Sequence, residues 1–122
     1  ALLSATACVF THNQGVLLVV YDVESPKPFH KQYAIEFNCG IALVLMPSQS
    51  ENTLAKLDIN FQSRKTEEMD MALSPPLVKL ISGNASAQPL KMLSAVANQD
   101  SREIFYDYFE NSAVEVKINP CN

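Results

Sequence analysis

Apolar and polar residues alternate along three stretches of this chain, and this pattern constrains the fold more than any other feature. In residues 33–39, 57–62 and 114–119, every second residue is apolar. Successive side chains of a β-strand point to opposite faces of the sheet. A period of two therefore predicts strands that bury one face and expose the other to water. We expect a mainly β chain.

Turn signals divide the chain into seven or eight short strands. We expect these strands over residues 5–11, 16–24, 32–38, 41–46, 54–62, 77–81, 90–97 and 113–119. The second of them is apolar on both faces at its start, as a strand in the centre of a sheet would be. Two consecutive prolines, Pro75 and Pro76, are expected to break any helix before residue 77.

Two further segments, 63–70 and 102–110, fall outside these predicted strands. Residues 63–70 are polar and charged, which is typical of a solvated loop. The stretch 102–110 fits either a strand, with Ile104, Tyr106 and Tyr108 on one side, or a short helical turn. We favour the helical turn, since Asp100 or Ser101 could cap it.

Short strands with regular turn signals predict an all-β fold. We expect an immunoglobulin-like antiparallel β-sandwich of about seven to eight strands, with a short helix near residues 101–110 as the exception. A parallel α/β sheet would need helical crossovers, which the pattern does not indicate. A closed barrel is the main structural alternative. The length of 122 residues fits a single sandwich domain over 1–122.

Composition excludes several classes of partner. The net charge of −4 argues against nucleic acid, which requires a basic face. The longest apolar runs, 16–20 and 41–46, are far shorter than the roughly 20 residues of a membrane-spanning helix. We therefore expect another protein as the partner, no nucleic acid, no membrane span, and a monomer or weak oligomer.

The three cysteines bear on the compartment in which the protein works. If residues 5–11 and 32–38 are strands, Cys8 shares the phase of Phe10, and Cys39 shares the phase of Phe37. Both would point inward, which favours a Cys8–Cys39 disulfide. Cys121 is an alternative partner for Cys39, and three free thiols are a further alternative. Disulfides persist in oxidising compartments, so a bridge would indicate export.

The first residues also favour export. Ala5, Thr6 and Ala7 fit the small-x-small pattern that precedes signal cleavage. We therefore expect an extracytoplasmic protein, periplasmic or secreted after signal removal. The same residues could equally lead into the first strand.

No group of residues forms a recognisable catalytic or cofactor site. The histidines His12 and His30 lie near no nucleophile motif, and Gly15, Gly40 and Gly83 are too scattered to form a phosphate-binding loop. Cys8 and His12 alone are too few ligands for zinc. The acidic residues of 63–70 are typical of a solvated surface. We expect no enzymatic activity, no catalytic residues, no cofactor and no metal site.

One triplet fits a modification motif. Asn84, Ala85 and Ser86 form a glycosylation sequon, which has meaning only in a eukaryotic secretory pathway. Such triplets also arise by chance.

Two cysteine-containing segments carry a family resemblance. Residues 7–10, Ala-Cys-Val-Phe, are followed some thirty residues later by the alternating segment 35–39, Ile-Glu-Phe-Asn-Cys. This arrangement resembles the paired cysteines of chaperone–usher fimbrial subunits. The resemblance implies a Cys8–Cys39 bridge and an incomplete immunoglobulin-like sandwich that a neighbouring subunit completes by donating a strand. The chain departs from that family in its three glycines and in its terminal Cys121.

The function that the sequence favours is binding of another protein. We expect a non-enzymatic exported module that acts through loops or a strand edge, such as an envelope binder, an inhibitor or an immunity-type protein. One alternative is a fimbrial-type structural subunit assembled by strand donation, with a role in cell adhesion. A second alternative is a small-ligand carrier.

Overall fold

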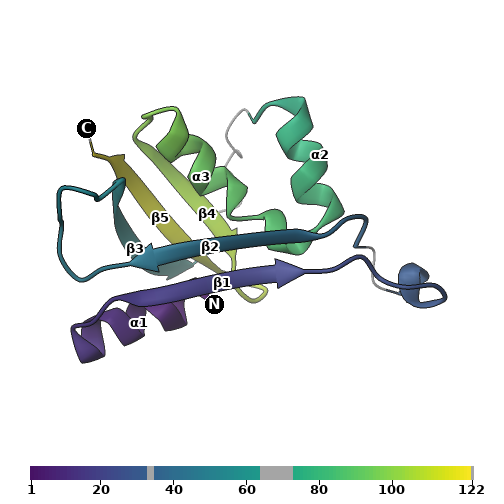
Figure 1. Ribbon diagram of the computed structural model, residues 1–122, viewed down its shortest axis with the longest axis horizontal. Helices are drawn as coiled ribbons and strands as arrows, with labels where there is room; N and C mark the ends of the chain where they lie inside the picture. Colours follow the sequence, from purple (N-terminus) through teal and green to yellow (C-terminus); the bar gives the residue numbers. More distant parts are fainter. Residues whose placement is uncertain (33–34, 64–72, 122) are drawn as a thin grey trace. The chain divides into compact units, whose positions relative to one another are not determined.

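The computed structural model describes residues 1–32, 35–63 and 73–121, and its elements are drawn in Figure 1. The helices within these residues are α1 (Leu2–His12), η1 (Phe29–Lys31), α2 (Pro75–Gly83), η2 (Ala85–Ala87) and α3 (Leu90–Ala97), of which η1 and η2 are 3-10 helices. The strands are β1 (Val16–Asp22), β2 (Cys39–Leu45), β3 (Ala55–Ser63), β4 (Arg102–Asp107) and β5 (Ser112–Pro120). The expected all-β, immunoglobulin-like sandwich is therefore wrong, because the chain is mixed α/β with two small sheets.

The chain divides into two compact units, which we describe one at a time. The first unit contains Ala1–Pro47 and Leu73–Leu90, and the second contains Ser48–Ala72 and Lys91–Asn122. The first holds the β1–β2 hairpin with α1, α2 and η2. The second holds β3, β4, β5 and most of α3. Each unit is built from two separate stretches of the chain.

The N-terminal segment is a helix, not the expected strand over 5–11. Helix α1 buries Ala5 and Val9, four residues apart, and leaves Phe10 75% exposed. A helix places residues four apart on one face, whereas a strand would also bury Ala7 between them, and Ala7 is exposed. Leucine and alanine also favour helix strongly. The helix ends at Asn13, whose φ of 49° is the left-handed conformation common at helix C-termini.

Two more expected strands, 77–81 and 90–97, are also helical. Helix α2 begins at Pro75, and the Ser74 carbonyl accepts the hydrogen bonds of the Leu77 and Val78 backbone amides. Proline in the first turn lacks only an N–H that has no partner inside the helix, so it starts this helix instead of breaking it. Helix α3 buries Met92 and Ala95, at helical spacing.

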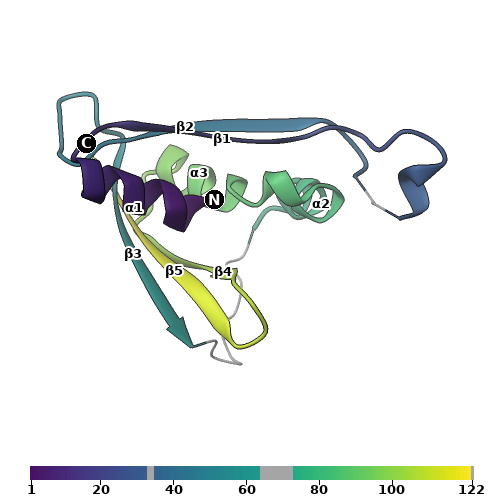
Figure 2. The same ribbon diagram turned by 90° about the horizontal axis from the view of Figure 1, so that it is seen from below.

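In the first unit, β1 and β2 form an antiparallel hairpin in which Leu18 pairs with Leu43. Figure 2 shows α1 on one side of this hairpin, and both α1 and η2 contact its strands. The strands expected over 16–24 and 41–46 are thus confirmed in outline. The strand expected over 32–38 is wrong: residues 33 and 34 lie outside the described part of the chain, and residues 35–38 are not extended in a sheet.

In the second unit, β5 lies between β3 and β4 in an antiparallel sheet. One face is apolar: Val116 of β5 pairs with Ile59 of β3 and Ile104 of β4, and is fully buried. The opposite face carries charges, and the Lys117 amine lies 3.5 Å from a Glu103 carboxylate oxygen. The strands expected over 54–62 and 113–119 are confirmed, with the apolar and polar faces that their alternation predicts.

Strand β4 corrects the helical turn favoured for residues 102–110. Ile104 and Tyr106 share the apolar face of the sheet, where they pair with Val116 and Val114 of β5. The strand alternative for this stretch is therefore the right one up to Asp107. The charged loop expected over 63–70 cannot be compared, because residues 64–72 lie outside the described ranges.

Tyr106 should make stability fall at high pH. Burial raises its pKa to about 12, and a hydrogen bond with the Met92 backbone offsets part of the rise. In the unfolded chain the phenol loses its proton near pH 10. The folded state therefore keeps a proton that the unfolded state has released. This contribution is fully present below pH 10 and is lost as the pH rises toward 12, by about 2–3 kcal/mol in total.

The measurement is the free energy of unfolding in urea at pH 9 and at pH 11.5. We expect the wild-type chain to lose more stability between these values than a Tyr106→Phe variant, which has no proton to release. Equal losses in the two chains would contradict the assignment to Tyr106.

Candidate functional site: an apolar hairpin face

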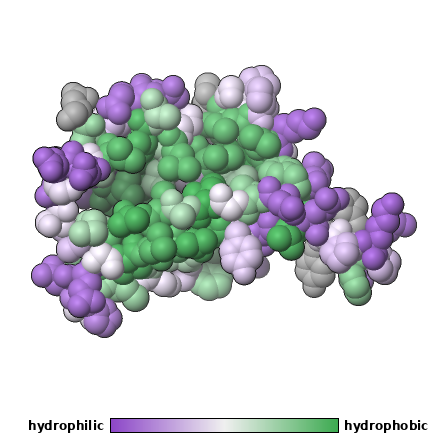
Figure 3. Space-filling model, in the orientation of Figure 1, coloured by the Kyte–Doolittle hydropathy of each residue, from purple (hydrophilic) through white to green (hydrophobic). Residues whose placement is uncertain are grey.

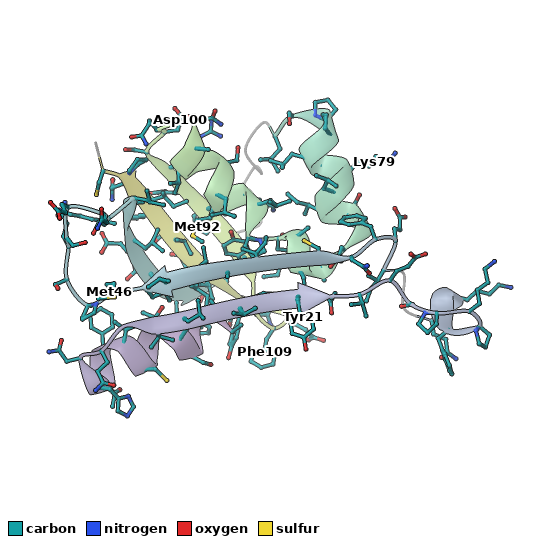
Figure 4. The ribbon with its side chains drawn as sticks, in the orientation of Figure 1. Tyr21, Met46, Lys79, Met92, Asp100 and Phe109 are labelled. Carbon is teal, nitrogen blue, oxygen red and sulfur yellow. The ribbon has the colours of Figure 1, made fainter. Side chains whose placement is uncertain are left out.

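The most unusual surface of the first unit is the side of the β1–β2 hairpin that faces away from α1. Its side chains alternate with the half-buried ones along both strands. We call this surface the apolar hairpin face and define it by Leu17, Val19, Tyr21, Ala42, Val44 and Met46. Five of them are large side chains that are between 53% and 71% exposed. Figure 3 shows hydrophobic colour over β1 and β2 on this side, and Figure 4 places Tyr21 and Met46 at opposite ends of the hairpin.

The strand register sets which side chains lie side by side on this face. Leu17 is paired with Val44, Val19 with Ala42, and Tyr21 with Gly40. None of these side chains carries a charge at neutral pH. Contiguous exposed apolar surface of this kind is rare on monomeric proteins and marks interaction sites.

The other side of the hairpin is held by polar contacts inside the first unit. The Ser86 hydroxyl donates a hydrogen bond of 2.6 Å to Asp22 at the end of β1. Asp22 shares its side of the strand with Leu18 and Val20, so this bond fixes which face of β1 turns toward η2. The apolar hairpin face is therefore the side left uncovered within its unit.

Asn84 holds the segment before β2. Its amide nitrogen donates a 2.7 Å hydrogen bond to the Phe37 carbonyl, and its side-chain oxygen accepts one of 2.8 Å from the Ser86 backbone amide. The residue is 1% exposed. The amide nitrogen is the atom that glycosylation would modify, and in the folded chain it is buried and bonded. Asn84 is therefore a structural residue here, and the sequon is not a surface acceptor site.

The three cysteines have free thiols in the structure, which contains neither predicted disulfide among its described residues. Cys8 lies exposed on α1, next to the buried face formed by Ala5 and Val9. The argument that Cys8 points inward with Phe10 assumed a strand and fails for a helix. Cys39 lies on the half-buried side of β2, while Cys121 belongs to the second unit. The Cys8–Cys39 pairing stays a prediction, which alkylation before and after reduction would test.

The remaining candidate groups do not gather into one place. The His12 ring nitrogen Nδ1 lies 3.1 Å from the Cys8 backbone carbonyl, not from its thiol. Among the residues that the structure describes, no three His, Cys, Asp or Glu side chains are grouped to hold a metal ion. Glu67, Glu68 and Asp70 lie outside the described residues. Within the described ranges, every helix is too short or too polar to cross a membrane.

The second unit carries a cluster of three aromatic side chains, which the sequence pattern does not predict. The rings of Phe61 and Tyr108 have centroids 5.5 Å apart, and those of Tyr108 and Phe109 are 4.6 Å apart, both edge to face. Phe109 is 79% exposed and has a φ of 59°, a strained conformation for a bulky side chain. This cluster fixes the turn between β4 and β5.

Comparison of the chain with models of protein families, with curated proteins and with solved structures finds no match.

Proposed function

We propose that the chain is a non-enzymatic, exported protein-binding module that binds its partner through the apolar hairpin face. The observation that carries this proposal is the exposure of the large apolar side chains on β1 and β2, with Leu17 at 64% and Val44 at 69%. Leaving such side chains in water forgoes about 1.5–3 kcal/mol of burial free energy for each of them. A partner that covers them recovers that free energy.

The strand edges of the hairpin support the same function. Within the described residues, β1 and β2 pair only with each other, so each leaves one edge without a partner strand. Soluble proteins usually protect such edges with lysine or proline, and neither strand contains either residue. The mechanism expected from the sequence, binding through a strand edge, is thus compatible with the hairpin.

The alternatives have less support. The fimbrial alternative requires an incomplete immunoglobulin-like sandwich, and the chain has no such sandwich. The small-ligand carrier stays a prediction, and no feature described above supports it. Export stays a proposal: the described residues contain no disulfide, and Ala5, part of the predicted cleavage pattern, is buried on α1.

The test places a photoreactive amino acid at position 44 of the full chain, in cells of the source organism. We expect a discrete cross-linked protein, and we expect it to disappear when Leu17→Glu is added to the same chain. The control places the same amino acid at Asp58, an exposed residue of β3 in the second unit. Cross-linking that is absent at position 44, or equal at both positions, would contradict the proposal.

A further inference from the structure

We propose that the partner of the apolar hairpin face is a second copy of this chain, stacked face to face on it in a two-fold dimer. This inference rests on the proposed function, since it names the occupant of the same surface. Two observations carry it: the shape of the face and its lack of charge.

The shape of the face comes from a difference in side-chain size between the two strands. In each of the three rows across the hairpin, the β1 side chain is larger than its β2 neighbour: Leu17 beside Val44, Val19 beside Ala42, and Tyr21 beside Gly40. Over these three rows the face is therefore a ridge along β1 and a trough along β2, and Met46, beside Gly15, closes the trough at the other end of the hairpin. The trough is deepest at Gly40.

The space above Gly40 is open within the described residues. A Cβ atom added at this glycine would meet only the Tyr21 Cβ, at an ordinary contact distance of 3.7 Å. The Tyr21 ring therefore does not fill the trough of its own chain, and it stands 71% exposed. The ring is therefore free to enter the trough of a second copy.

A two-fold axis parallel to the strands makes two such faces complementary. Rotation about this axis places β1 of one copy over β2 of the other, so the ridge of each copy enters the trough of its partner. Tyr21 of one copy then lies over Gly40 of the other, and Val19 lies over Ala42. Stacked sheets pack about 10 Å apart, a distance that interdigitated side chains fill.

The lack of charge on the face favours a second copy over a charged partner, and the small size of the face limits the strength of the dimer. The chain has a net charge of −4, yet no ionisable group on the face, apart from the Tyr21 phenol, would face its own image. The face consists of six side chains, well below the roughly 20–30 residues that each partner contributes to a standard interface. We expect a weak dimer, with a dissociation constant on the order of 10 μM.

The test is sedimentation equilibrium of the purified full chain from about 1 to 500 μM, ten-fold and more on each side of that constant. We expect a monomer of 13.5 kDa at low concentration and twice that mass at high concentration. A Gly40→Tyr variant, which fills the trough, should weaken the dimer at least tenfold. Adding Tyr21→Ala to that variant should restore it, since the ring then projects from β2 into a trough on β1.

The substitutions are chosen so that each variant should keep the fold of the wild-type chain. Gly40 lies in a strand and does not have a positive φ, so tyrosine fits its backbone. The control Asp58→Tyr adds the same ring to β3 and should leave dimerisation unchanged. Far-ultraviolet circular dichroism and the melting temperature confirm that each variant folds.

The outcomes separate this inference from the proposed function. A chain that stays monomeric at 500 μM, or a dimer that Gly40→Tyr leaves intact, as strand-edge pairing would, overturns face-to-face stacking. In either case a cross-link from position 44 to a different protein would leave the proposed function standing. A cross-linked species of twice the chain mass, together with loss and recovery in the two Gly40 variants, supports the dimer.

Discussion

Asn84→Ala should destabilise the chain by about 3 kcal/mol, although the residue lies in no catalytic or binding site. The substitution removes both side-chain hydrogen bonds, leaving the buried Ser86 amide without its acceptor and the Phe37 carbonyl without its donor. An unpaired buried polar group costs about 1–3 kcal/mol, and here two groups lose their partner together. The measurement is the free energy of unfolding in urea.

Two controls locate the effect. Ser86→Ala removes only the hydroxyl bond to Asp22 and should cost about 1 kcal/mol. Asn119→Ala removes the same amide from an exposed position and should change stability by less than about 0.5 kcal/mol. Hydrogen exchange of the Glu36 amide, which bonds to the Gly83 carbonyl, should accelerate in Asn84→Ala. A loss below 1 kcal/mol would mean that water replaces the two bonds.

Ile118→Ala should have a comparable effect in the second unit, about 3–4 kcal/mol. Ile118 is 1% exposed on the central strand β5, between Leu57 of β3 and Arg102 of β4. Truncation removes buried methyl groups and leaves a void that paired strands on both sides cannot readily close. Urea unfolding measures the loss.

The neighbouring residue provides the matched control. Lys117 lies on the opposite, charged face of the same strand, beside Glu103 and Glu115. Lys117→Ala removes exposed ion pairs that contribute little, so we expect a change below about 1 kcal/mol. Similar losses for Ile118→Ala and Lys117→Ala would show that the two faces of this sheet are not distinct.

The strands that the sequence predicts most closely are β3 and β5, whose outer face is charged, while β1 and β2 are confirmed only in outline. Along the middle of β3 and β5 apolar and charged residues alternate, so that Leu57 and Ile118 lie on the apolar face while Asp58 and Lys117 lie on the opposite face. The helices were missed for the opposite reason. Helix α1 has few charged residues to mark its outer side, so the spacing of Ala5 and Val9 is hidden among other apolar residues.

The sequence predicts no binding site on β1 or β2. Strand β1 is apolar on both faces, which the sequence presents as the pattern of a central, buried strand. In the structure the second apolar face, with Val19 and Tyr21, is exposed. Sequence periodicity shows that a face is apolar, but it does not show what covers it. The ridge and trough depend on the pairing of Tyr21 with Gly40, a register that no local pattern specifies.

The interleaving of the two units has a consequence for synthesis on the ribosome. The hairpin is complete at residue 45, but Ser86, which bonds its inner side, is translated about forty residues later. Until then the nascent hairpin has α1 as its main cover, and residues 48–72, which are made in between, belong to the other unit. At every cut point between residues 48 and 90, the N-terminal fragment lacks part of both units. A fragment that ends at residue 90 holds the whole first unit, but it also carries residues 48–72 of the second. We therefore expect that no single cut separates the two units, and that the second unit can form only once residues 91–122 have been made.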